Sequence, residues 1–207
     1  MKKLFIAIIC LLSLGMAQAQ TVSKATVEQY RQLQKLNQQS FSTCSDQLTK
    51  WGFVHNEKGV INMFTMLLHP FYRAEGQDTV AALLGVINDV VYSTSGVFSS
   101  MDAERTYAMI AQAGEIQQQL ASEMGLIKYV CSIKGKVSNK HPKNREELVA
   151  VLTEGSAETV KWVYESWKSD DGKVTLTLMY DNKLFEKKKP RKSDRVELTL
   201  GLGTVPE

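Results

Sequence analysis

The stretch KWVYESWKSDDGKVTLTLMY, residues 161–180, indicates the fold most directly. Two runs of strand-forming residues flank Ser169-Asp170-Asp171-Gly172, and the Asp-Gly pair supplies the positive φ angle that a tight turn requires. We therefore predict a β-hairpin with strands over residues 161–168 and 173–180. Residues 195–202 alternate between apolar and polar side chains in the same way, so we expect them to close the sheet.

The aromatic residues of this hairpin divide between its two faces. Trp162 and Tyr164 share one face of the first strand, and Trp167 points to the other. If helices cover only one side of the sheet, one set lies in the core and the other is exposed. An exposed aromatic side chain there could stack on a sugar or a peptide.

Two long helices are expected before the hairpin. Residues Thr26–Lys50 carry a stripe at spacings of three and four that is apolar except at Asn37, and Gly52 provides a stop. The second helix is expected to open at Ser99-Ser100-Met101-Asp102 and to end at Gly125. Shorter helices are predicted from Asp78 to Ile87 and from Asn144 to Leu152, and strands over residues 90–94 and 126–133. Residues 53–77 receive no assignment, because periodicity does not separate a strand from a buried helix there.

Three similar segments occur twice along the chain in the same order. Trp51-Gly52-Phe53 resembles Met124-Gly125-Leu126, and residues 80–83 and 90–93 resemble residues 149–152 and 162–165. Either an internal duplication or chance accounts for these matches between apolar residues. On the first interpretation, residues 20–97 and 98–207 form two α+β halves.

The first nineteen residues have the three parts of a secretory signal peptide. Lys2 and Lys3 precede a short apolar run, and Ala17-Gln18-Ala19 forms a small-x-small cleavage site. We therefore expect a mature chain that begins at Gln20 and is periplasmic or secreted in a bacterium. Outside this segment no run reaches the roughly 20 apolar residues that span a bilayer, so we expect no membrane-spanning segment after cleavage.

Composition and motifs exclude several functional classes. The net charge is +3, and two of the positive charges leave with the signal peptide, so a nucleic-acid partner is not expected. The chain contains no Gly-x-Ser-x-Gly, His-Glu-x-x-His, phosphate-loop or dinucleotide motif. His55, His69 and His141 lack metal-ligand spacing, so we predict no metal site, no cofactor and no named catalytic residues.

Two cysteines remain after cleavage. Cys44 lies on the apolar stripe of the first helix and Cys131 on the apolar face of a predicted strand, so both should point into the core. Two interpretations remain open: a disulfide between Cys44 and Cys131, which export favours, or two buried thiols.

A basic run is the sharply charged feature of the chain. It contains Lys187, Lys188, Lys189, Arg191 and Lys192, with Pro190 inside it and Glu186 and Asp194 beside it. One interpretation is a solvated loop between two strands. The other is an anion-binding patch for lipid headgroups, polysaccharide or a partner protein.

The predicted fold class is α+β, with two long helices packed on an antiparallel or mixed sheet and, on the duplication interpretation, two similar halves. This order across Thr26 to Leu202, with the signal peptide, resembles small uncharacterised exported proteins of Bacteroidetes-type bacteria, including tandem helix-plus-sheet domains of the β-lactamase-inhibitor-like kind. The resemblance implies a periplasmic, protein-binding role and carries over no functional residues. We expect a non-catalytic binding module of the bacterial envelope whose partner is an envelope protein or an anionic component. The alternative is a small envelope hydrolase.

Overall fold

A computed structural model describes residues 29–136, 141–191 and 193–206. The expected signal peptide, its cleavage site and Lys192 of the basic run lie outside these residues. Among the described residues, no helix has the length and apolar character needed to cross a membrane.

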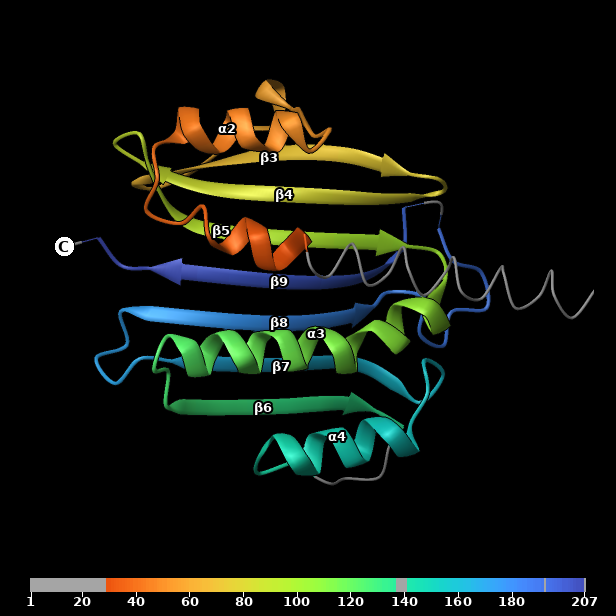
Figure 1. The fold of residues 1–207 in the computed structure, drawn as a ribbon. Coiled ribbons are helices and arrows are strands. Elements are labelled where there is room, and N and C mark those ends of the chain that lie inside the picture. The colour runs from red at the N-terminus through yellow and green to blue at the C-terminus, as the bar shows by residue number, and fades with distance from the viewer. Residues whose placement is uncertain (1–28, 137–140, 192, 207) are drawn as a thin grey trace, which may run out of the picture.

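The described residues form one antiparallel sheet of nine strands in the order β1-β3-β4-β5-β9-β8-β7-β6, with β2 paired to β3 (Figure 1). The strands are β1 (Val54–His55), β2 (Ile61–Met63), β3 (Met66–Glu75), β4 (Asp78–Ile87), β5 (Val90–Ser100), β6 (Lys128–Gly135), β7 (Val160–Lys168), β8 (Val174–Asn182) and β9 (Val196–Thr204). The named helices are α2 (Phe41–Lys50), α3 (Ala103–Glu123), α4 (Arg145–Glu154) and the short 3₁₀ helix η1 (Glu57–Gly59). The sheet dominates, so the predicted α+β fold built on two long helices is wrong.

The expected helix over Thr26–Lys50 is interrupted in its middle. Residues 29–34 are helical, and α2 begins only after turns. Gln38 adopts a positive φ of 64° and donates its N–H to Val91 O (2.6 Å). Ser40 then caps α2 by accepting from the N–H of Thr43 (3.3 Å). Pairing with β5 and this cap satisfy backbone groups that a continuous helix would have used, and so the helix breaks.

The helix predicted over residues 78–87 is a strand instead. This segment is β4, and its backbone pairs with β3 on one side and β5 on the other. Val80, Ala82 and Leu84 are fully buried. A short apolar run is equally compatible with a helix and a central strand, and the two neighbouring strands decide in favour of the strand.

Three other local predictions are confirmed. Gly172 has the positive φ of 74° that its turn requires, and β7 pairs antiparallel with β8. α3 is a single helix of 21 residues whose N-cap, Asp102, accepts from the N–H of Arg105 (2.8 Å). Asn144 caps α4 in the same manner through the N–H of Glu147 (2.9 Å).

The two expected halves are not separate units. The proposed boundary at residues 97 and 98 falls inside β5, and β5 pairs with β9 to make the sheet continuous. Residues 80–83 lie in a strand, whereas residues 149–152, their supposed counterpart, lie in α4. This matched pair of segments therefore does not share a secondary structure.

The helices α2, α3 and α4 lie on one face of the sheet (Figure 1). α3 packs on β7, β8 and β9, α2 on β4 and β5, and α4 against β6. The core lies between these helices and the side chains that alternate toward them, such as Leu178, Tyr180, Leu198 and Leu200. Within residues 29–136, 141–191 and 193–206, no α-helix lies on the opposite face of the sheet.

Candidate functional site

The strand register aligns the side chains of the uncovered face in rows that cross the sheet. One row, here called the central band, runs from β1 to β6 through eight strands. Its members are Val54, Tyr72, Ala81, Val97, Thr199, Met179, Tyr164 and Ser132. No member of the central band is charged.

A second row, here called the small-residue band, lies beside the central band. It contains Pro70, Leu83, Ser95, Gly201, Thr177, Ser166 and Val130. At its middle, a Cβ atom on Gly201 would come within 2.8 Å of Thr177 Oγ1 and 3.1 Å of Ser95 Oγ. Glycine therefore keeps this part of the face low, and the two bands together form a surface without charges.

Charged residues stand in the rows on either side of the two bands at the β6–β9 end of the sheet. In the row next to the central band, Trp162 lies between Lys134 on β6 and Asp181 on β8, and Glu197 on β9 follows. Lys128 and Lys168 are paired in the row next to the small-residue band. The uncovered face thus has an uncharged centre with charged residues beside it over β6–β9, while the flanking rows over β4 and β5 contain Thr79, Ser99, Gly85 and Ser93. Charged residues beside an uncharged centre are typical of protein–protein interfaces.

Aromatic side chains stand at the β7 end of the face. The rings of Trp162 and Tyr164 are nearly parallel, with centroids 5.8 Å apart, and Lys134 Nζ lies 5.1 Å from the centroid of the Trp162 ring. Trp167 points to the helices, is buried, and donates its Nε1–H to Gln118 Oε1 (2.8 Å). This division confirms the alternation expected from the sequence, and the half-buried pair is the one on the uncovered face.

Large apolar side chains on this face are exposed to solvent. They are Val54, Ile61, Met63, Tyr72, Val130 and Met179, with exposed fractions from 36% to 71%. Phe64, at the turn between β2 and β3, is fully exposed and has a positive φ of 59°. An exposed apolar surface of this extent is typical of a site that another molecule covers.

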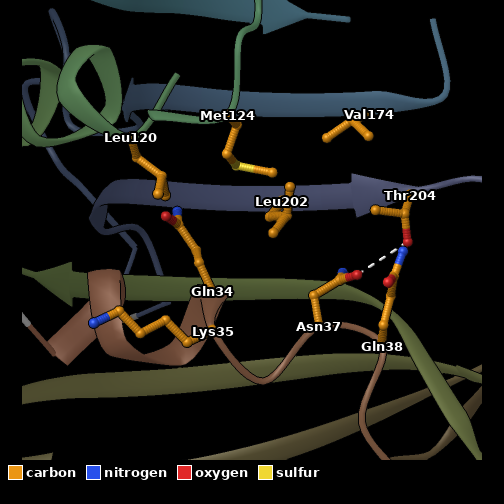
Figure 2. A pocket seen from close by; sticks show the side chains of 9 residues that line it. All are labelled: Gln34, Lys35, Asn37, Gln38, Leu120, Met124, Val174, Leu202 and Thr204. Atoms are coloured by element: carbon orange, nitrogen blue, oxygen red, sulfur yellow. Dashed lines mark hydrogen bonds between the residues drawn. The ribbon is translucent and has the colours of Figure 1, made fainter. Parts of the chain in front are cut away.

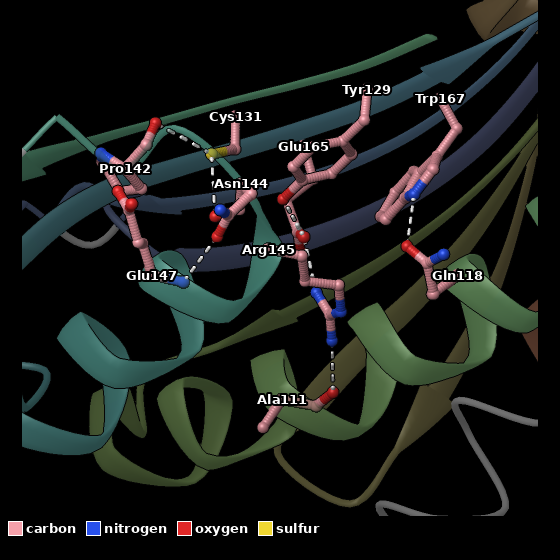
Figure 3. Close-up of polar contacts among 10 residues, drawn as sticks. All are labelled: Ala111, Gln118, Tyr129, Cys131, Pro142, Asn144, Arg145, Glu147, Glu165 and Trp167. Carbon is pink, nitrogen blue, oxygen red and sulfur yellow. Dashed lines mark hydrogen bonds and ion pairs between the residues drawn. The ribbon is translucent and has the colours of Figure 1, made fainter. Parts of the chain in front are cut away.

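The helix-covered face holds a cluster of titratable groups between α3, α4, β6 and β7 (Figure 3). Glu165 is completely buried and contacts the Arg145 guanidinium, and it accepts a hydrogen bond from the Tyr129 hydroxyl (2.7 Å). Burial, reinforced by the negative charge of Glu165, raises the pKa of Tyr129. The cluster joins two helices to the sheet and is compatible with a structural role.

The thiol of Cys131 lies beside this cluster. It donates to Pro142 O (3.4 Å), and burial raises its pKa above the ordinary value. A nucleophilic cysteine requires a lowered pKa, since the thiolate is the reactive form. Cys131 is therefore not an activated nucleophile, and it does not support the alternative function of a small hydrolase.

Of the two interpretations of the cysteines, the disulfide between Cys44 and Cys131 is not formed, since both cysteines are free. Cys44 is buried in α2, which packs on β4 and β5, whereas β6, which contains Cys131, is at the far edge of the sheet. Cys131 is only half-buried, so the prediction that both thiols are buried holds for Cys44 alone.

Two of the three histidines meet. His69 Nδ1 lies 3.3 Å from His55 Nε2, with the ring of Phe41 4.2 Å from that of His69. Burial lowers the pKa of His69, and the neighbouring His55 lowers it further. Within the described part of the chain, no group of three or more His, Cys, Asp and Glu side chains is placed to hold a metal ion.

The basic run lies in the connection from β8 to β9, at one end of the sheet. Lys188, Lys189 and Arg191 are exposed, whereas Lys187 Nζ forms an ion pair with Asp194 Oδ2 (2.8 Å). The structure thus shows a loop in which one of the proposed anion-binding residues already has an internal partner.

Sequence analysis identified the aromatic pair but not the face to which it belongs. The polar alternation of Thr175, Thr177 and Thr199 was a signal that these strands have one uncovered side. Assembly of the bands depends on strand order and register, which the sequence does not show.

In comparisons with known proteins, no family model, no curated protein and no solved structure matches this chain.

Proposed function

We propose that this protein is a non-catalytic binding module of the bacterial envelope that docks a partner protein on the uncovered face of its sheet. The observation that carries the proposal is the uncharged surface of the central and small-residue bands, which charged residues flank over β6–β9. Apolar and aromatic residues with few charges characterise the middle of protein interfaces, and charged residues their rim.

The dimensions of the face favour a protein over a small ligand. Neighbouring strands lie about 4.8 Å apart, so the eight strands of the central band span about 34 Å. A stable interface buries roughly 800 Å² on each partner, which a surface of this width provides. Tyr72, Tyr164 and Met179 supply the side-chain types that are enriched at such interfaces.

The export part of the proposal rests on the signal peptide expected over residues 1–19. A partner would therefore be met in the periplasm or outside the cell. The rim carries both signs of charge, Asp181 and Glu197 near Lys134, so it can orient a partner by complementary charges.

Site-specific photo-crosslinking in intact cells tests the proposal. A benzophenone amino acid at Met179 or Tyr164 is expected to give a discrete protein adduct. The same amino acid at Glu115, exposed on α3 on the other face, is expected to give none. Changing Val97 to Arg, in the middle of the central band, should remove the adduct, whereas changing Glu115 to Arg should leave it.

Two outcomes would contradict the proposal. Equal crosslinking from both faces would show that the uncovered face is not selective. Crosslinks to lipid or polysaccharide instead of protein would assign the face to another class of ligand. An adduct of twice the chain's mass would identify a second copy as the partner protein, and sedimentation of the purified chain would verify it.

A further inference from the structure

His55 and His69 meet on the helix-covered side of the sheet, away from the proposed docking face. They are 14 residues apart in the sequence, which is no metal motif, and strand pairing brings them together. His55 on β1 is the register partner of Phe71 on β3, and His69 lies two residues before Phe71 on the same strand. The two histidines are therefore diagonal neighbours across an antiparallel pair. The ring of Phe41 on α2 packs against both of them.

The distance between the two rings suits a metal ion. The facing nitrogens, His55 Nε2 and His69 Nδ1, are 3.3 Å apart. A tetrahedral zinc ion holds imidazole nitrogens at about 2.0–2.1 Å, so any two of them lie about 3.3 Å from each other. Ligands at right angles, as in square-planar copper and nickel sites, would be about 2.9 Å apart. The separation in this pair therefore fits a tetrahedral ion.

The same two nitrogens form a hydrogen bond in which one of them carries the proton. A neutral imidazole can move this proton to its other ring nitrogen, and both facing nitrogens then offer a lone pair. An ion bound to both lies off the line that joins them, so each ring has to turn by about 35°. The terminal torsion of histidine is broad, and such a turn costs little energy.

The sheet and its aromatic residues hold both rings. His55 stacks on the fully buried Phe71, with centroids 4.5 Å apart and planes 20° from parallel. His69 belongs to β3, whose other side pairs with β4 at Leu84. Both histidines are nevertheless only half-buried. The pair is thus supported by the fold and keeps the contact with solvent through which an ion can enter.

We propose that His55 and His69 bind one Zn²⁺ ion, with His55 Nε2 and His69 Nδ1 as the two protein ligands. Imidazole nitrogen is among the ligands that zinc prefers. Within the described part of the chain, no third His, Cys, Asp or Glu side chain joins the pair, so water fills the other two positions. Binding is reversible, because closed structural zinc sites use four protein ligands. The ion ties the two-residue strand β1 to β3.

NMR of the imidazole ring nitrogens tests the proposal, because it reports which nitrogen binds. The isotope-labelled chain is titrated with Zn²⁺ at about pH 7.5, where an ordinary histidine is neutral. The signals of His55 Nε2 and His69 Nδ1 are expected to shift together and to saturate at one ion per chain. The signals of His141 should not move. Mg²⁺, which prefers oxygen ligands, should shift none of them.

Variants separate this site from zinc bound elsewhere, for example at a thiol. H55Q and H69Q each remove one ligand, and the ring that remains should report zinc binding at least about tenfold weaker. H141Q removes an exposed histidine outside the pair and should leave the affinity within about twofold. Backbone spectra check that each variant folds. Zinc should also raise the melting temperature of the wild type but not of H69Q.

Three results would overturn the proposal. The absence of saturable shifts up to about 1 mM Zn²⁺ would mean that the pair is a hydrogen bond only. A shift of one ring alone would show that the two histidines do not share an ion. Zinc affinity that H69Q leaves unchanged would place the site elsewhere. None of these results bears on the docking face, since neither histidine belongs to the central band or the small-residue band.

Discussion

The Arg145 guanidinium in α4 lies against the Glu165 carboxylate in β7, which is completely removed from solvent. Arg145 also donates to Ala111 O (3.3 Å) in α3, so a single side chain connects two helices with the sheet. Since the charge of Glu165 has no access to water, its stability in the fold depends on Arg145 and on the Tyr129 hydroxyl.

Replacing Arg145 with Met should leave Glu165 as a buried charge without its cation. We expect a loss of about 3–5 kcal/mol in the free energy of unfolding. Urea denaturation measures it. Lys183→Met is the matched control, because Lys183 and Glu197 form an exposed pair (2.7 Å) whose loss should cost less than about 1 kcal/mol. If both variants lose the same small amount of unfolding free energy, Arg145 does not stabilise the buried charge of Glu165 and the interpretation is wrong.

Gly114 faces the same guanidinium from within α3, and a Cβ atom there would overlap it. Alanine normally stabilises a helix interior relative to glycine by about 0.5–1 kcal/mol. Here we expect Gly114→Ala to destabilise the protein by about 1–3 kcal/mol, as overpacking does. The same substitution in the Arg145→Met background should lose this penalty, and a double-mutant cycle from urea denaturation would show whether it does.

The histidine pair predicts a pH dependence of stability. Burial and the neighbouring His55 lower the pKa of His69 in the folded state, whereas its unfolded pKa is about 6.5. As pH falls below about 6.5, the unfolded chain binds a proton that folded His69 resists, so stability should decrease. His69→Gln should flatten this slope between about pH 7 and 5, while His141→Gln, at an exposed position, should not. Thermal unfolding across this range distinguishes the two variants.

The cysteines should differ in reactivity. Cys44 is fully buried, donates to Leu36 O (3.3 Å) and has a pKa raised by burial to about 11, whereas Cys131 is half-buried. We expect iodoacetamide to label Cys131 before Cys44 in the native protein, as shown by peptide mass mapping. Labelling in denaturant without reductant should modify both. Protection of both under that condition would show that a disulfide does form.

The basic loop is expected to be neutral for stability. Changing Lys188, Lys189 and Arg191 to Ser should alter the free energy of unfolding by less than about 0.5 kcal/mol per site, because all three are exposed. We also expect no binding of the wild type to phosphatidylglycerol vesicles at low salt. Salt-sensitive binding that these substitutions abolish would instead establish the anion site.

Much of the fold could be predicted where short-range chemistry decides the structure. Asp171-Gly172 permits a turn whatever lies around it, and Asp102 and Asn144 cap helices through N–H groups three residues away. The alternation that separates Trp162 and Tyr164 from Trp167 is likewise a property of any extended strand.

The sequence pattern was insufficient where two structures suit the same residues. Residues 78–87 became a strand because β3 and β5 satisfy their backbone groups on both sides. The stripe over Thr26–Lys50 is continuous enough for one helix, yet Gln38 pairs with Val91 and ends it. In both places the deciding hydrogen bonds come from other segments of the chain.

The sequence by itself determined the hairpin, α3, α4 and the alternation of the last strand, since each depends on residues within a few positions of one another. Only the tertiary structure decided which face of the sheet stays uncovered and which residues meet there. Val54 and Ser132 share the central band because strand order and register align them across eight strands. Gln34 and Asn37 line one pocket (Figure 2) because residues 34–38 fold back against α3 and β9. Contacts between such distant segments arise from the packing of the whole chain, and no local pattern encodes them.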